Sequence, residues 1–374
     1  MKNWFCLFIV FVILFGLSRC ANAVQVRNYT WNEQKQDHKQ YQQLQKAAAR
    51  YQKLKNKTEW SEILLPKRSV LKLNDSSGVI RSIKNRLEIL GDLRRASPSD
   101  VYTTKLEDAV KSFQFRHGLE DDGLIGPAFI KALNVPLETR INQLLINMER
   151  IRLDSIPRFG KRIVANIPEY RLYVYEDNNE VLSMDIVVGK NTNPTIAFED
   201  TLKNVVFSPY WNIPASIVKD EILPEINKNS GYLKSNNMEI IGNLDGLPVI
   251  RQKPGPENSM GKVKFIFPNE HSIYFHDTPA KSLFDRKNRA FSHGCIRLSQ
   301  PFALAKFLLK DQPKWPDDAI RAAMDSGSEK WLTLVQPVPV FIIYYTAWVD
   351  QSGDVHFRDD IYGHDKEHLG FDTL

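Results

Sequence analysis

Apolar residues in the first half of the chain recur at helical spacing. Leu44, Ala48 and Tyr51 form a thin apolar stripe within the Gln- and Lys-rich residues 32–57, which predicts one amphipathic helix. The stripe fits docking on another part of the protein, and the polar remainder fits a solvated linker helix equally well. Further helices are predicted at 79–90, at 106–117, from residue 127, and at 140–152, with Gly91 and Gly118 ending the first two.

From residue 162 onward the pattern changes to short β-rich runs. These lie at 162–167, 171–175, 181–188, 203–207, 262–267, 272–275 and 338–345. A polar, helical-looking stretch from about residue 215 to 258 interrupts them and is interpreted as an insertion that caps one face. An apolar helix is predicted at 301–309, with Ser299 as its N-cap. The fold class predicted is therefore α+β, with a mainly-β sandwich-like domain, an inserted cap and a small α-helical domain.

The N-terminus has the pattern of a secretory signal. Lys2 precedes an apolar run at residues 5–17, and Ala21-Asn22-Ala23 supplies small residues for cleavage before Val24. A lipoprotein signal ending at Cys20 is disfavoured because Arg19 stands where a small residue is expected. The run is too short to span a bilayer, and no later stretch approaches that length. We therefore expect a signal peptide at 1–23 and a mature, extracytoplasmic protein without a membrane span.

Composition adds limits. The 374 residues suffice for two domains with sizeable cores. The formal charge is +6, but acidic and basic residues alternate along most of the chain. No basic run with interleaved aromatic residues is present, which argues against nucleic acid as a partner.

Cysteine usage isolates one thiol. Cys6 and Cys20 lie in the segment that would be removed, so only Cys295 remains after export. An unpaired thiol in an oxidising compartment is open to oxidation. A lone cysteine is often a small buried apolar residue, and the neighbouring sequence must decide between that role and chemistry.

The neighbourhood of Cys295 favours chemistry. A thiol needs a base or a positive field to act as a nucleophile, and His276 and His293 are both near in sequence. Gly294 permits a sharp turn that presents amide groups to an oxyanion, and Arg297 offers donors to a carboxylate. These residues predict a thiol acyl-transfer site. A metal site made of His276, His293 and Cys295 is the alternative, disfavoured because no fourth ligand is evident.

Longer motifs resemble known families. His276, residues 277–291, and then Ser-His-Gly-Cys-Ile-Arg resemble the signature of the YkuD-type L,D-transpeptidase catalytic domain. Residues 109–119 and 122–126 are similar to the peptidoglycan-binding-like domain of wall enzymes. Residues 208–214, 251–256, 264–269 and 344–348 fit the large periplasmic branch that carries a substrate cap. An early loop departs from the family pattern, with Pro194 displaced before Thr195, and Phe275 stands where leucine is common.

The resemblance implies roles for six residues of the motif. Cys295 is the implied nucleophile and His276 its general base. His293 would orient the thiolate, and Gly294 would shape the oxyanion pocket. Ser292 and Arg297 would order the site or bind substrate. No metal or organic cofactor is implied.

The resemblance also implies an activity and an organisation. A periplasmic enzyme would take tetrapeptide stems of peptidoglycan through a thioester and cross-link the third residues of two stems, with carbapenems as inhibitors. L,D-carboxypeptidase trimming, D-amino-acid exchange and protein attachment share that thioester, and a non-catalytic wall-binding protein is a further alternative. A sortase-like enzyme is disfavoured by the short distance between histidine and cysteine. The expected parts are an N-terminal helical segment at 24–67, a peptidoglycan-binding-like domain at 68–157 and a catalytic domain at 158–374; protein partners are not indicated.

Overall fold

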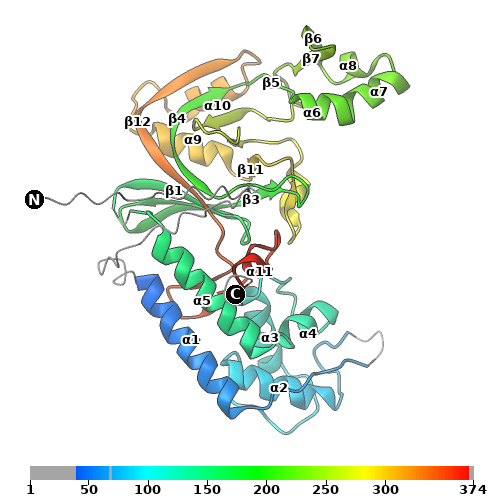
Figure 1. The fold of residues 1–374 in the computed structure, drawn as a ribbon, viewed down its shortest axis with the longest axis vertical. Helices are drawn as coiled ribbons and strands as arrows, with labels where there is room; N and C mark the ends of the chain where they lie inside the picture. Colours follow the sequence, from blue (N-terminus) through cyan, green and yellow to red (C-terminus); the bar gives the residue numbers. More distant parts are fainter. Residues whose placement is uncertain (1–38, 67–69, 158, 370–374) are drawn as a thin grey trace, which may run out of the picture.

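The structure is a computed structural model that describes residues 39–66, 70–157 and 159–369. The predicted signal peptide at 1–23 lies outside these residues. Figure 1 shows a helical part and a β-rich part that lie end to end, with the C-terminal segment between them. In the described ranges, no helix combines the length and apolarity needed to cross a membrane.

The predicted helices are confirmed with small shifts of their ends. They are α1 (Lys39–Lys57), α2 (Val79–Leu90), α3 (Thr104–Arg116), α4 (Pro127–Leu133) and α5 (Leu137–Leu153). Gly91 and Gly118 follow α2 and α3 with φ angles of +93° and +66°, the left-handed backbone that favours glycine. Leu44 and Tyr51 of α1 are buried in a core shared with α5, so α1 docks on the helical part and is not a solvated linker.

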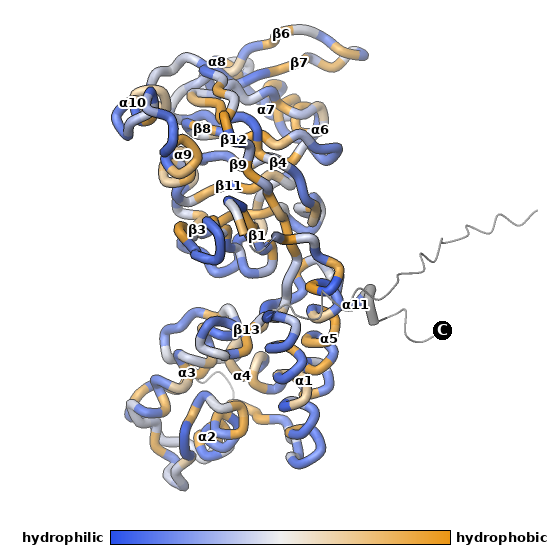
Figure 2. Tube along the Cα trace, turned by 90° about the vertical axis from the view of Figure 1, so that its left-hand side faces the viewer, coloured by the Kyte–Doolittle hydropathy of each residue, from blue (hydrophilic) through white to orange (hydrophobic). Residues whose placement is uncertain are grey.

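The core of the helical part also takes in a hairpin from the far end of the chain. Strands β13 (Ala347–Val349) and β14 (Val355–Phe357) pair with each other, and their apolar residues pack among those of α1 to α5. Figure 2 shows β13 among these helices. The predicted boundary at 67/68 separates α1 from helices with which it shares this core. The predicted boundary at 157/158 places the hairpin in the catalytic domain, although it packs in the helical part.

The β-rich part is one curled sheet. Its strands are β1 (Lys161–Asn166), β2 (Arg171–Glu176), β3 (Asn179–Gly189), β4 (Phe198–Phe207), β8 (Val263–Ile266), β9 (Phe275–His276), β10 (Ala290–Ser292), β11 (Ile296–Leu298) and β12 (Lys330–Ile343). They follow the order β10-β3-β11-β9-β8-β4-β12-β1-β2, and β2 also pairs with β3, which closes the sheet on itself. Alternate residues of each strand point into the enclosed core, as the two-residue period of a β-strand requires.

Two helices complete this core. Leu304 and Leu309 of α9 (Pro301–Leu309) and Ile320 of α10 (Asp317–Met324) pack into it. The predicted N-cap Ser299 is wrong: Gln300 occupies the cap position, and the Ser299 hydroxyl is buried without a hydrogen-bond partner in the described part of the chain. The predicted α+β class, with a β-rich catalytic domain and a helical N-terminal domain, is confirmed.

The insertion folds around a small core of its own. It contains β5 (Trp211–Asn212), α6 (Ala215–Ile217), the π-helical turn η2 (Val218–Ile222), α7 (Leu223–Lys228), α8 (Tyr232–Ser235), β6 (Met238–Leu244) and β7 (Leu247–Gln252). The helical pattern predicted there holds for the first half only. The second half is the β6–β7 hairpin, which projects from the molecule beside α8 (Figure 1).

Candidate active site

Strands β9 and β11 lie side by side and set the geometry of the site. They run parallel, with Phe275 opposite Ile296 and His276 opposite Arg297. Phe275 and Ile296 are fully buried in the core of the curled sheet. Because successive residues of a strand point to opposite faces, Tyr274, His276, Cys295 and Arg297 share the outer face. The structure thus brings together the predicted histidine, cysteine and arginine.

His276 is held as a neutral imidazole of defined tautomer. Its ring is buried, and Nδ1 lies 2.5 Å from the main-chain oxygen of Asp277. A carbonyl only accepts hydrogen bonds, so Nδ1 carries the proton and Nε2 is left as the basic nitrogen. Burial, and then the positive charge of Arg297, lower the pKa of His276 to about 3.

The Cys295 thiol is half-buried and lies beside Tyr274. Its Sγ is 3.6 Å from the main-chain oxygen of Ser272. Burial raises the pKa of Cys295, while hydrogen bonds from the main chain and hydroxyl of Tyr274 and the charge of Arg297 act in the opposite direction. No hydrogen bond joins the thiol to His276 or His293 in the described part of the chain. The resting pair is therefore a neutral thiol and a neutral imidazole.

Two hydrogen bonds of the Ser292 hydroxyl stabilise the turn before Cys295. Gly294 has a φ of +112°, and its N–H donates to Ser292 Oγ at 3.1 Å. The same hydroxyl donates to the Cys295 carbonyl at 2.5 Å. The predicted sharp turn is present, but the Gly294 amide is used within it. The Cys295 N–H makes no hydrogen bond to any described residue and remains available to an oxyanion.

The early loop that departs from the family pattern also contacts this turn. Thr195 is buried, and its hydroxyl donates to the Gly294 carbonyl at 2.7 Å. The same oxygen accepts the Gly189 N–H at 2.8 Å. The loop thus positions the cysteine turn through one side chain.

His293 faces the insertion. Its Nε2 is 2.7 Å from Glu221 Oε1, which η2 carries, and 3.4 Å from Lys190 Nζ. The ring is partly exposed and is the point where the insertion touches the cysteine turn. A role in orienting the thiolate stays a prediction, since the hydrogen bonds of the ring run to its neighbours on the outside.

Arg297 is a cation without a protein counter-ion. Its Nε is buried without a hydrogen-bond partner, and no carboxylate among the described residues pairs with it. Burial lowers its pKa, and the nearby Cys295 thiol raises it. A half-buried guanidinium without acceptors in the protein can bind a carboxylate that enters the site.

Three further side chains of the site have no predicted role in the sequence. The alternation of β9 could have revealed Tyr274, which stands two residues before His276. Thr195 and Glu221 give no local signal, because each reaches the turn from a distant segment. Within the described residues, no group of three or more His, Cys, Asp or Glu side chains could hold a metal ion.

Two family models match the two parts of the chain. Residues 160–326 match the model described as "L,D-transpeptidase catalytic domain" (YkuD). Residues 76–133 match the model described as "Putative peptidoglycan binding domain". The chain therefore contains a YkuD L,D-transpeptidase catalytic domain preceded by a domain of the peptidoglycan-binding type.

Several known proteins are similar to the chain. A Haemophilus influenzae protein named "Putative L,D-transpeptidase" is 33% identical over 247 residues, which cover 62% of this chain and 50% of the relative. The chain thus spans about half the length of that curated relative. An L,D-transpeptidase from Stackebrandtia nassauensis is 13% identical, with a TM-score of 0.29 and coverage of 75% of this chain and 97% of that one. An LD transpeptidase solved in complex with imipenem is 16% identical, with a TM-score of 0.25 and coverage of 49% and 59%.

Proposed function

We propose that this chain is an L,D-transpeptidase of the large periplasmic branch with a substrate cap. It cross-links the third residues of two peptidoglycan stems through a thioester on Cys295. One observation carries the proposal: a half-buried thiol, a neutral histidine and an unpaired arginine share one face of two adjacent parallel strands. That combination suits an acyl donor that ends in a carboxylate.

The first half-reaction forms the thioester. The proton of Cys295 Sγ passes to Nε2 of His276 as the sulfur attacks the carbonyl carbon of the third residue of a tetrapeptide stem. The Cys295 N–H and the Tyr274 hydroxyl stabilise the tetrahedral oxyanion. The amide C–N bond then breaks, the imidazolium protonates the leaving amine of D-alanine, and the acyl group stays on sulfur. Arg297 binds a carboxylate of the donor stem.

The second half-reaction transfers the acyl group. A side-chain amine of another stem attacks the thioester, His276 takes a proton from that amine, and the C–S bond breaks to restore the thiol after reprotonation. Water competes with the amine at this stage. The insertion contacts the cysteine turn through Glu221 and His293, a position suited to limiting the access of water.

Other outcomes of the same thioester define the alternatives. Water as acceptor gives an L,D-carboxypeptidase, and a free D-amino acid gives exchange. A wall-binding protein without catalysis would leave stems unchanged. We also propose export through the N-terminal signal and action in the periplasm, because that is where tetrapeptide stems are found.

Muropeptide analysis tests the activity. The mature chain from Val24 is incubated with tetrapeptide-rich sacculi, which are then digested and analysed by mass spectrometry. We expect dimers linked between third residues, with release of D-alanine. Tripeptide monomers without dimers would show trimming, and unchanged tetrapeptides would refute the enzymatic proposal.

Acylation by imipenem tests the residue roles separately. Intact-mass spectra should show one adduct on the wild-type chain and none on Cys295→Ala. The matched pair His276→Ala and His293→Ala assigns the base. We expect a large loss of acylation rate, about 100-fold or more, for the first and a small effect for the second. The reverse order would move the base role to His293.

A further inference from the structure

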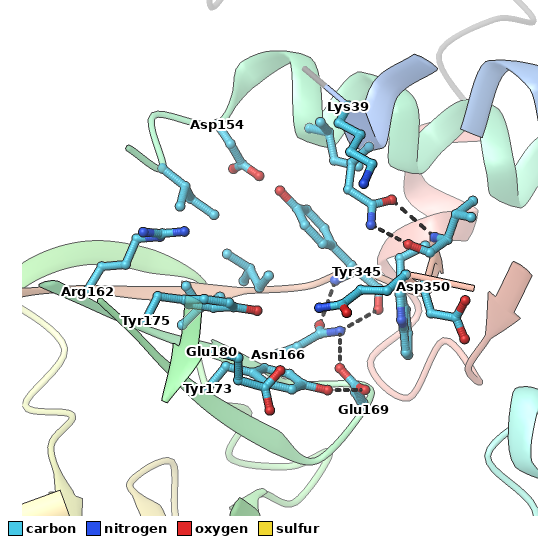
Figure 3. Close-up of a pocket in the computed structure, with 18 of the residues that line it drawn as sticks. Lys39, Asp154, Arg162, Asn166, Glu169, Tyr173, Tyr175, Glu180, Tyr345 and Asp350 are labelled. Atoms are coloured by element: carbon cyan, nitrogen blue, oxygen red, sulfur yellow. Dashed lines mark hydrogen bonds between the residues drawn. The ribbon is translucent and has the colours of Figure 1, made fainter. Parts of the chain in front are cut away.

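A cavity of about 470 Å³ lies between the helical part and the curled sheet. Its floor is the outer face of β1 and β2, and its other walls are the start of α1, the end of α5 and residues 348–351 (Figure 3). None of the residues around the Cys295 thiol lines it. Its volume is within the range of small-molecule and cofactor sites.

Aromatic rings line the floor and a neighbouring wall. Tyr173 and Tyr175 stand two residues apart on β2 and so share a face, with ring centroids 6.2 Å apart and planes inclined by 28°. Tyr345 and Trp348 add two more rings. A row of rings offers a broad apolar surface with little side-chain freedom to lose on binding.

The rings are fixed before any ligand arrives. The Tyr173 hydroxyl donates to Glu169 at 2.6 Å. The Arg162 guanidinium lies 4.5 Å from the Tyr175 ring centroid, and Trp348 stacks on His356 with centroids 5.2 Å apart. A surface held by its neighbours in this way is preorganised for binding.

Several polar groups along the cavity make no hydrogen bond within the described part of the chain. The Tyr175 hydroxyl and the Glu180 carboxylate make no hydrogen bond to any described residue, and the amides of Asn178, Gln43 and Gln351 likewise make none. Figure 3 shows Glu180 beside the tyrosine row. These groups provide both donors and acceptors at the edge of an apolar floor.

From this arrangement we propose that the cavity binds a β-1,4-linked N-acetylated glycan strand. A pyranose ring has an apolar C–H face, which suits an aromatic floor, and a rim of hydroxyl and acetamide groups, which suits the unpaired polar groups. The choice of a wall glycan rests on the proposed function. Bound there, the sugar backbone would hold the enzyme on its polymeric substrate apart from the Cys295 site.

Charge disfavours an acidic peptide as the ligand. The lining carries the carboxylates of Asp154, Glu169, Glu180 and Asp350 against two cations, which repels an acidic stem peptide.

Calorimetric titration of the mature chain with the tetramer of β-1,4-linked N-acetylglucosamine, which has no stem peptides, tests the proposal. We expect saturable binding that Tyr175→Ala weakens by about tenfold. Glu180→Ala should also weaken it and keeps the fold intact, because this residue is exposed. Trp331→Ala is the matched control, an aromatic residue that is 57% exposed and lies outside the cavity, and should bind like the wild type.

Absence of saturable binding, or equal binding by Tyr175→Ala and Glu180→Ala, would overturn the inference. Saturable binding of choline in place of the glycan, lost in Tyr175→Ala, would also overturn it in favour of a cation site. Imipenem adduct formation, measured on the same preparation, separates this inference from the proposed activity. An adduct without glycan binding refutes the glycan site alone, and glycan binding without an adduct refutes the enzymatic proposal alone.

Discussion

Lowering the pH from 7 to 5 should leave the rate of Cys295 acylation almost unchanged. The reason is the environment of His276, whose pKa falls to about 3 through burial and through the charges of Arg297, Lys264 and Lys281. The hydrogen bond to the Asp277 main chain opposes this shift but does not cancel it. The imidazole is therefore still neutral, and still able to accept the thiol proton, at pH 5.

The size of the effect separates this arrangement from an ordinary histidine. A base with a pKa of 6.5 would be about 76% neutral at pH 7 and about 3% neutral at pH 5, so the rate would fall about 25-fold. With a pKa near 3, about 99% of the imidazole is neutral at pH 5, and the rate loss is about 1%. The thiol does not change this conclusion, because burial raises the pKa of Cys295 and the sulfur is protonated throughout the interval.

The assay is the second-order rate of imipenem acylation, followed by intact mass at constant ionic strength from pH 5 to 7. An acid limb with an apparent pKa between 6 and 7 would refute the neutral-pair reasoning. Arg297→Gln provides an internal check, since removal of a positive neighbour should move any acid limb to higher pH. The shape of the profile is compared, and not the absolute rate, because Arg297 is also proposed to bind substrate.

The same depressed pKa makes stability depend on pH, and the fold must be checked at pH 5. His276 is neutral in the folded protein but protonates near pH 6.5 in the unfolded chain. The free energy of unfolding is therefore unaffected by this group above pH 6.5 and decreases as the pH falls toward 3. At pH 5 the loss from this group is about 2 kcal/mol. Circular dichroism at each pH shows whether the rates come from folded protein.

Three further changes have defined outcomes. Ser292→Ala removes both hydrogen bonds of the cysteine turn, and urea titration should show a loss of about 2–3 kcal/mol in unfolding free energy. Glu221→Gln weakens the exposed contact of the insertion with His293, so muropeptide analysis should show hydrolysis rising about two- to fivefold relative to cross-linking; an unchanged ratio would contradict a lid role. Asp92→Asn leaves the buried Arg116 guanidinium without its carboxylate, so urea titration should show about 3–5 kcal/mol of lost stability, with imipenem acylation of the folded fraction unchanged.

Local sequence was sufficient to predict the residues that carry the chemistry, but only one of the strands beside them. The Ser292–Arg297 block and His276 lie close together in the chain, and the predicted run at 272–275 reaches the strand that contains His276, whereas β10 and β11 were not predicted. The helices of the N-terminal part had clear apolar stripes and glycine stops. In each case the signal lies within one turn or one strand, where periodicity and backbone preference act directly.

Long-range contacts could not be predicted in the same way. Thr195 and Glu221 are ordinary polar residues of a loop and a helical turn, and only the tertiary fold brings them to the cysteine turn. The β6–β7 hairpin was missed because β6 has no alternation of buried and exposed residues: its apolar residues Ile240, Ile241 and Leu244 are all exposed. The closure of the sheet by β2 and β3, and the return of β13 and β14 to the helical part, depend on pairing and packing that no single segment encodes.

The register between β9 and β11 links the core to the chemistry. A slip of one residue would exchange the two faces of β11 and turn Cys295 and Arg297 into the apolar interior. Such a slip would also expose Ile296 and Leu298, each now fully buried, at a cost of about 1.5–3 kcal/mol per side chain. The apolar residues behind the strand therefore hold the thiol and the guanidinium on the outer face. A charged substitution at Ile296 should remove activity and stability together, although its side chain points away from the reacting atoms.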